Sequence, residues 1–116
     1  MINDQLIYVA HPFGGDKANK YSIDTIMENL VMLDKNNTYL SPIHNFSMLY
    51  FDTQYSKGLK ICLDMLNRCD ALVLCGDWET SKGCIGEWSF AIAKGMPIYT
   101  WKEWTDKLKE QGDNSR

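Results

Sequence analysis

Short apolar segments alternate along this chain with longer segments of helical periodicity. Apolar runs rich in strand-forming residues predict four strands, at residues 5–10, 38–40, 70–75 and 97–100. Apolar residues at helical spacing predict helices at residues 17–34, 59–68, 83–95 and 101–110. Residues 43–55 mix aromatic and polar side chains, and we expect a loop with short helical turns there. Alternation of this kind is typical of βαβ units, so the sequence predicts an α/β fold with a parallel sheet.

The length and composition indicate one globular domain. A chain of 116 residues with 45% hydrophobic residues can bury a real core. We expect this domain to span residues 1–110, and the polar residues 111–116 to form a flexible tail. The net charge of −3 argues against a nucleic-acid polymer as partner, since phosphate contacts need a basic face. A single small nucleotide stays open as a ligand, because backbone N–H groups can hold one phosphate.

The cysteines and apolar runs bear on compartment and metal binding. None of the four cysteines forms a Cys-x-x-Cys pair, and the two histidines are not clustered with them. We therefore expect no metal site and no cofactor, and reduced thiols that pack as small hydrophobic residues. No apolar run approaches the roughly 20 residues needed to span a membrane, and no signal peptide is recognisable. These features predict a cytoplasmic protein with no membrane partner.

The loop that follows the strand at residues 70–75 holds the most informative residues. Ser81 stands where the next helix begins, so its side chain is placed to cap that helix near an anion. Glu87 follows six residues later, and a glutamate near the positive end of a helix ionises readily. An ionised carboxylate facing a cleft can act as a nucleophile. The alternatives are a plain capping serine and an exposed helical glutamate. The same loop offers Asp77, Trp78 and Gly83 as ligand contacts.

The loop after the first strand is the second candidate. This loop follows the predicted strand that contains Tyr8. It supplies a histidine, an aromatic ring and a glycine pair: His11, Phe13, Gly14 and Gly15. Glycines between a strand and a helix can place backbone N–H groups against a phosphate. The loop is neither a Gly-x-Gly-x-x-Gly fingerprint nor a Walker loop, and an ordinary strand-to-helix turn explains it equally well.

Four segments in order resemble the nucleoside 2-deoxyribosyltransferase-like superfamily. They are residues 8–13 (Tyr-Val-Ala-His-Pro-Phe), Ser41-Pro42, residues 68–74 (Arg-Cys-Asp-Ala-Leu-Val-Leu) and Ser81-x-Gly83-x-x-x-Glu87. The closer match is a group of small bacterial and phage domains, and the resemblance covers roughly residues 5–100. It implies a flavodoxin-like, three-layer sandwich with four to five parallel strands. It also implies cleavage or transfer at an N-glycosidic bond, and a homodimer or larger homo-oligomer.

The resemblance further implies roles for individual residues. Glu87 matches the family glutamate that attacks the sugar C1′, and Tyr8 matches the aromatic residue that orients it. Asp64 is the candidate for the proton donor to the base, at an offset shifted by about two residues. Ser81 matches members that hydrolyse nucleoside 5′-monophosphates, whereas transferases acting on nucleosides carry an aspartate there. A hydroxyl at a helix N-terminus tolerates a phosphate dianion, and a carboxylate repels it.

Two functional hypotheses follow, and a third is retained. The first is an enzyme that hydrolyses or transfers the N-glycosidic bond of a nucleotide or nucleoside through Glu87. The second is a non-catalytic module that senses or sequesters a nucleotide, which the shifted position of Asp64 favours. The third is an interaction domain whose aromatic surface binds another protein.

Overall fold

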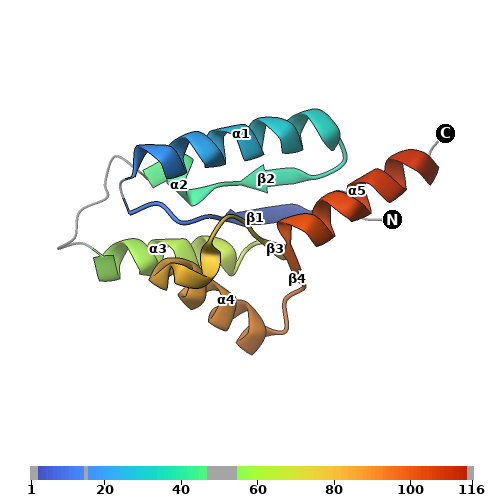
Figure 1. Ribbon diagram of the computed structural model, residues 1–116. Coiled ribbons are helices and arrows are strands. Elements are labelled where there is room, and N and C mark those ends of the chain that lie inside the picture. The colour runs from blue at the N-terminus through green and yellow to red at the C-terminus, as the bar shows by residue number, and fades with distance from the viewer. Residues whose placement is uncertain (1–2, 15, 47–54, 115–116) are drawn as a thin grey trace.

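The chain forms a four-stranded parallel sheet with helices on both faces (Figure 1). The computed structural model describes residues 3–14, 16–46 and 55–114. The elements, in chain order, are β1 (Leu6–Ala10), α1 (Lys17–Leu33), β2 (Thr38–Leu40), α2 (Pro42–Phe46), α3 (Tyr55–Leu66), β3 (Ala71–Leu74), the 3₁₀ turn η3 (Trp78–Thr80), α4 (Lys82–Lys94), β4 (Ile98–Thr100) and α5 (Trp101–Asn114). The strand order is β2-β1-β3-β4, and all three pairings are parallel. The predicted α/β fold is confirmed.

The helix ends differ in places from the prediction. Helix α3 begins at Tyr55, four residues before its predicted start, and α5 continues to Asn114, four residues beyond its predicted end. Once a helix is nucleated, each further residue adds a hydrogen bond at little cost, even where the sequence is polar. The end of α4 is as predicted, because Gly95 caps it in the left-handed conformation at φ 77°. Of the predicted loop, residues 47–54 lie outside the described residues.

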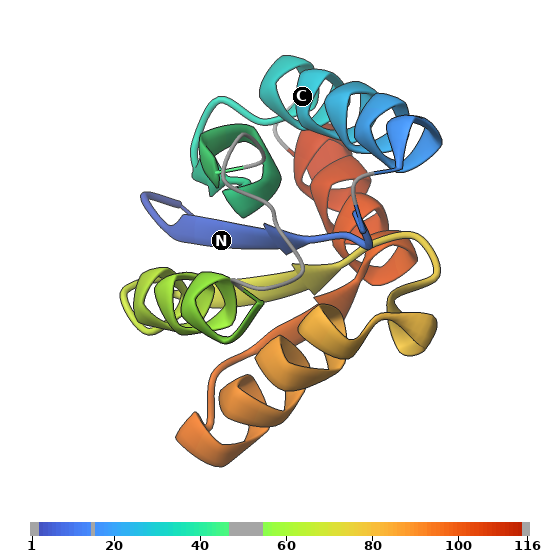
Figure 2. The same cartoon turned by 90° about the vertical axis from the view of Figure 1, so that its left-hand side faces the viewer.

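The sheet separates two apolar layers, and successive residues of β1 point into different layers. Ile7 and Val9 pack with residues of α1 and α5, including the fully buried Trp104. Tyr8 and Ala10 pack on the other face with residues of α3 and α4. Figure 2 shows the helix pairs on opposite sides of the sheet. This alternation with a period of two turns Tyr8 toward α4, where Glu87 lies.

The chain reverses direction across the sheet between β1 and β3. From β1 it runs outward through α1 to β2, and it then returns through α2 and α3 to β3 on the other side of β1. Ligands of open α/β sheets bind at such a switch point, beyond the carboxyl ends of the strands. The loops that begin at His11 and Gly76 meet there. No helix among the described residues is long and apolar enough to cross a membrane.

Candidate active site

The start of α4 brings its functional side chains onto one face of the helix. Ser81 is the N-cap, and its Oγ accepts a hydrogen bond of 3.3 Å from the Cys84 N–H. Cys84, Glu87 and Ala91 follow at intervals of three and four residues, so they share the face that packs on the sheet. The carboxyl group of Glu87 is therefore directed inward, toward β1, and its side chain is only 5% exposed. The alternative of an exposed helical glutamate is excluded.

Glu87 is hydrogen-bonded to the tyrosine at the centre of β1. The Tyr8 hydroxyl donates to Oε2 of Glu87, and the Tyr8 side chain is fully buried. This contact joins residues 79 positions apart in the chain. A phenol that donates to one carboxylate oxygen fixes the plane of the carboxyl group. The structure therefore brings together the two residues that the sequence paired.

The second oxygen of this carboxyl group faces a different environment. Oε1 of Glu87 has no hydrogen-bond partner among the described residues. The described part of the chain contains no fully buried side-chain oxygen without a partner. One oxygen is thus anchored by Tyr8 and the other has no partner among the described residues, an arrangement that suits a positioned nucleophile.

Burial changes the ionisation of both members of this pair. Loss of hydration raises the pKa of Glu87 to about 7, and the hydrogen bond from Tyr8 partly opposes that rise. The sequence predicted easy ionisation from the helix terminus, and this was wrong because burial outweighs the helix dipole. Burial and the neighbouring carboxylate raise the pKa of Tyr8 far above its usual value, so Tyr8 remains a hydrogen-bond donor.

Thiols complete the wall around this pair. Burial is the main cause that raises the pKa of Cys62 to about 11 and that of Cys84 to about 12, and the charge of Glu87 adds to both. These thiols are neutral at physiological pH and act as small, weakly polar packing groups. They belong to the apolar layer into which the carboxyl group of Glu87 is directed.

The amino end of α4 has unused hydrogen-bond donors. The backbone N–H groups of Lys82 and Gly83 are the first two of the helix and have no partner among the described residues. A Cβ added at Gly83 would meet only the Ser81 Oγ, at 3.9 Å, so the space beside it is open. Free N–H groups, a hydroxyl and the positive end of a helix together suit an anionic group.

His11 is held from both sides by the chain itself. Its Nδ1 lies 2.7 Å from the Pro12 carbonyl oxygen. A carbonyl oxygen can only accept a hydrogen bond, so Nδ1 carries a proton and donates it. The other ring nitrogen, Nε2, lies 2.9 Å from the Ser22 Oγ. Gly76 packs directly on the ring: at φ 61°, a Cβ there would lie 2.9 Å from Nε2. His11 therefore braces the junction of β1 and β3, and both its nitrogens are already engaged.

The rest of the first loop offers less to a ligand than the sequence suggested. Phe13 packs against the core beneath α1 and is not free in the cleft. Gly14 is exposed at φ 58° with open space around it, and Gly15 lies outside the described residues. Asp16 caps α1, and its Oδ1 accepts from Ala18 N at 2.7 Å and Asn19 N at 3.3 Å. The carboxylate of Asp16 thus occupies the position that an anion would take at α1.

Asp64 does not reach the site. Its side chain is 62% exposed on α3 and bonds Lys60 at 2.9 Å, one turn earlier. Cys62 faces the site from the same helix, and residues two apart on a helix point in nearly opposite directions. The structure therefore places Asp64 on the outer side of α3, away from Glu87.

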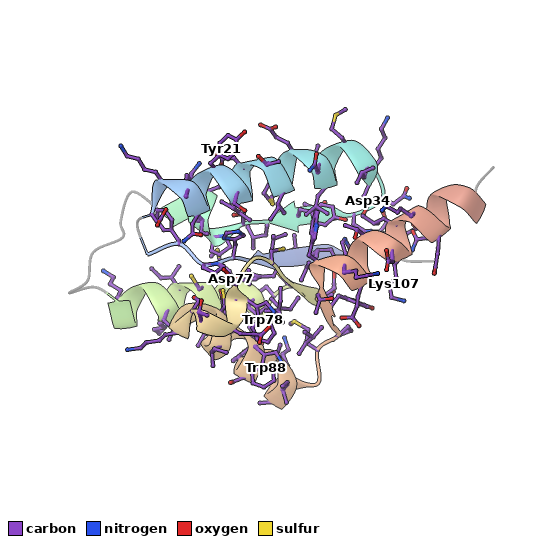
Figure 3. All side chains as sticks on the ribbon, viewed as in Figure 1. Tyr21, Asp34, Asp77, Trp78, Trp88 and Lys107 are labelled. Atoms are coloured by element: carbon purple, nitrogen blue, oxygen red, sulfur yellow. The ribbon has the colours of Figure 1, made fainter. Side chains whose placement is uncertain are left out.

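The other two candidates of the second loop lie at its rim. Asp77 is exposed at the start of η3, and its carboxylate has no partner among the described residues. Trp78 is half-buried and packs on Trp88 of α4, with ring centroids 5.9 Å apart (Figure 3). Trp78 therefore supports the helix, whereas Asp77 is available to a ligand.

Two structural residues were missed at the sequence level. Gly76 was read only as part of a loop, although a glycine directly after a buried strand is a signal for close backbone approach. Ser22, which holds His11, gave no local signal, since its contact depends on how α1 packs on the sheet. Asp70, directly before β3, holds the first residue of β1: its Oδ2 accepts from the Leu6 N–H at 2.7 Å.

Two solved structures share this arrangement. A 2-deoxyribosyltransferase from Bacillus psychrosaccharolyticus aligns with a TM-score of 0.63 at 20% identity, over 82% of this chain and 70% of that protein. A conserved protein from Enterococcus faecalis V583 aligns with a TM-score of 0.66 at 22% identity, over 84% of this chain and 62% of that protein. At these identities the likeness establishes the fold, and the predicted fold family is confirmed. The comparison with curated proteins gave no match.

A family described as a domain of unknown function (DUF4406) matches residues 5–100. This range begins just before β1 and ends with β4, so it includes every strand and the Tyr8–Glu87 pair. The chain belongs to the DUF4406 family and has the fold of a 2-deoxyribosyltransferase.

Proposed function

We propose that this protein cleaves the N-glycosidic bond of a nucleotide or nucleoside, with Glu87 as the nucleophile. The observation that carries the proposal is the buried Tyr8–Glu87 pair at the switch point of the sheet, with Oε1 of Glu87 left open. The neighbouring 2-deoxyribosyltransferase supports the same class of chemistry through its shared fold.

The reaction takes place in two steps. Oε1 of Glu87 attacks C1′ of the sugar, the C1′–N bond breaks, and the base leaves with the bonding electrons and accepts a proton. A water molecule then attacks C1′ of the glycosyl ester, loses a proton and releases the Glu87 carboxylate, which gives hydrolysis. An acceptor base in place of water gives transfer. No cofactor is required by either step.

Asp77 is the carboxyl group that we assign to the departing base. It lies in the loop after β3, at the same edge of the sheet as Glu87, and its side chain is free among the described residues. Asp64 points to solvent and pairs with Lys60, so we do not assign it a part in the proposed reaction. Two carboxyl groups with different roles are the usual equipment for cleavage at a sugar C1.

We assign a phosphorylated sugar as the preferred substrate. The hydroxyl of Ser81 and the free N–H groups of Lys82 and Gly83 can surround a 5′-phosphate at the start of α4. The phosphate belongs at α4 rather than at the Gly14–Gly15 loop, because Asp16 already occupies the amino end of α1. The proposed setting is cytoplasmic, with a small-molecule nucleotide rather than a nucleic acid or a membrane as partner.

A non-catalytic nucleotide-binding module is the second candidate. It is favoured by the remoteness of Asp64, which leaves no second carboxylate buried beside Glu87 among the residues that the structure describes. With a pKa of about 7, Glu87 is also protonated in about half of the molecules at neutral pH. A binding module would use Glu87 to accept a hydrogen bond from a sugar hydroxyl and would return the ligand intact.

A chromatographic assay for free base separates the two functions. The substrates are ribo- and deoxyribonucleoside 5′-monophosphates beside their parent nucleosides, with wild type, Glu87→Gln and Asp64→Asn. We expect base release from monophosphates, a loss of about 10³-fold or more in Glu87→Gln, and unchanged rates in Asp64→Asn. Binding without base release would establish the module. Equal rates in wild type and Glu87→Gln would remove Glu87 from the mechanism.

A further inference from the structure

Cys62 is a side chain of α3 that lies against the Tyr8–Glu87 pair. It is half-buried and packs on the apolar layer that contains Tyr8. A side-chain hydrogen bond links the Cys62 thiol with the Tyr8 hydroxyl, and the charge of Glu87 acts on the same thiol. Asp64 stands two residues later and is turned outward to Lys60. The group that this part of α3 presents to the candidate site is therefore a thiol.

Close packing of α3 on α4 holds Cys62 in this place. Gly86 directly precedes Glu87, and a Cβ added at Gly86 would lie 3.5 Å from Cδ1 of Leu59. The two helices are thus in contact beside the backbone of Glu87. Leu59 is three residues before Cys62, so the two side chains share one face of α3. The contact at Gly86 therefore also turns Cys62 toward α4, where the charge of Glu87 acts on its thiol.

The direction of the hydrogen bond between Cys62 and Tyr8 follows from the available protons. A tyrosine hydroxyl has one proton to donate, and its oxygen can also accept. Tyr8 donates its proton to Oε2 of Glu87. Burial raises the pKa of Cys62 to about 11, so the thiol keeps its proton at neutral pH. The bond must therefore run from the Cys62 S–H to the Tyr8 oxygen.

We propose that Cys62 is a positioning residue for the reaction: its S–H donates to the Tyr8 oxygen and so directs the Tyr8 O–H at Glu87. This inference rests on the proposed function, in which Glu87 is the nucleophile. Hydrogen bonds in series polarise one another, so a hydroxyl that accepts from a thiol is a stronger donor to a carboxylate. The thiol therefore helps to hold the carboxyl group in one orientation and to keep it ionised. We assign Cys62 no contact with the substrate.

Cys69 allows a packing role to be separated from a positioning role. It is buried in the same apolar layer, and its Sγ lies 3.4 Å from the Met65 carbonyl oxygen. The charged groups that act on its thiol are Asp70 and Lys94. Cys69 thus resembles Cys62 in burial and in hydrogen bonding, but its neighbours lie outside the candidate site. If both thiols only filled space, replacing either of them would have the same effect on base release.

Substitutions of Cys62 that differ in one property test the proposal by kinetics. Cys62→Ser keeps a donor of similar size, whereas Cys62→Val fills the space without a donor. For a nucleoside 5′-monophosphate, kcat should fall about three- to tenfold in Cys62→Val with KM unchanged, and should stay within about twofold of wild type in Cys62→Ser and in Cys69→Val. Circular dichroism would verify that the variants are folded. A fall of the same size in Cys62→Ser or Cys69→Val, or none in Cys62→Val, would overturn the proposal.

A measurement that needs no turnover tests the same series of hydrogen bonds. The pKa of Glu87 is obtained from urea unfolding over a pH series, as the difference between each protein and the same protein with Glu87→Gln. Loss of the thiol donor should raise this pKa in Cys62→Val, and Cys62→Ser should keep the wild-type value. This result without base release by wild type would remove the proposed function and leave Cys62 as the residue that positions Tyr8. An equal pKa in all three proteins would refute the inference, whether or not base is released.

A double-mutant comparison tests whether Cys62 acts through the Tyr8 hydroxyl. Tyr8→Phe already removes that hydroxyl, so adding Cys62→Val should lower kcat no further and should leave the pKa of Glu87 at its value in Tyr8→Phe. A general effect of the valine on the hydration of Glu87 would persist in this background. Losses in kcat that multiply would show that Cys62 acts independently of Tyr8 and would contradict the proposal.

Discussion

The buried carboxyl group of Glu87 should make the stability of this protein depend on pH in a specific direction. Its pKa is about 7 in the folded protein, against an ordinary value of 4.5. Between these values the folded state binds a proton that the unfolded state releases. The stability contributed by protonated Glu87 is therefore fully present below pH 4.5, falls as the pH rises, and is lost above about pH 7.

The size of the effect follows from the same two values. A rise in the pKa of Glu87 from 4.5 to about 7 on folding corresponds to a loss of about 3 kcal/mol in the free energy of unfolding once the carboxyl group is ionised. This is a large part of the total for a small domain, which is about 5–15 kcal/mol. Glu87→Gln keeps the shape of the side chain and an acceptor for the Tyr8 hydroxyl, but it cannot ionise.

Urea unfolding of wild type and Glu87→Gln at pH 4.5 and pH 8 measures this contribution. The stability of the variant relative to wild type should rise by about 3 kcal/mol between the two pH values, a midpoint difference of about 1–3 M urea. All other titrating groups are common to both proteins and cancel in this difference. Any change in the free energy of unfolding that the glutamine amide causes at all pH values also cancels, because it is the same at pH 4.5 and pH 8.

The free energies of unfolding of wild type and Glu87→Gln could instead change with pH by the same amount. Glu87 would then have the same pKa in the folded and unfolded chain, which does not fit a carboxyl group that is only 5% exposed. That result would refute the burial of Glu87 and, with it, the arrangement of one anchored and one open oxygen.

Three further predictions concern the surroundings of this carboxyl group. Tyr8→Phe removes the hydrogen bond that lowers the pKa of the buried carboxyl group, so the midpoint of the pH–rate profile of base release should move above 7. Gly76→Ala forces a Cβ against His11 at a positive φ and should cost about 2–4 kcal/mol in urea unfolding, whereas Gly14→Ala, also at positive φ but in open space, should cost about 1–2. Ser81→Asp keeps an efficient N-cap but repels phosphate; thermal unfolding should be unchanged, while a competition assay should show at least a tenfold fall in the preference for monophosphates over nucleosides. An unchanged preference would place the phosphate elsewhere.

The layout of the sheet could be predicted from the sequence because each strand is short, apolar and bounded by turn residues. Residues 70–75 have no alternation of apolar and polar positions, and this is what a central strand buried on both faces requires. The short helix α2 was predicted only as helical turns within a loop. Five residues give too little periodicity for a more definite prediction.

The site was predictable where it depends on one helix and less so where helices meet. Cys84, Glu87 and Ala91 share the inner face of α4 because they are three and four residues apart, which the sequence shows. The outward position of Asp64 could be predicted from the sequence: the apolar residues at 59, 62 and 66 mark the inner face of α3, and position 64 falls on its outer side. The partner of His11 was not predictable, because Ser22 reaches it only after α1 has packed.

The energetics of Glu87 also bear on why a carboxyl group is present at all. A glutamine, or an apolar residue of similar size, would fit beneath α4 without the cost of about 3 kcal/mol that ionisation imposes at neutral pH. The hydrogen bond from Tyr8 offsets only part of that cost, since Cys62 and Cys84 are uncharged and no cation contacts the carboxyl group among the described residues. A group that opposes stability in this way is expected where function requires it. A carboxylate with one anchored oxygen is suited to attack on an electrophilic carbon, and under the function proposed here that carbon is C1′ of a sugar.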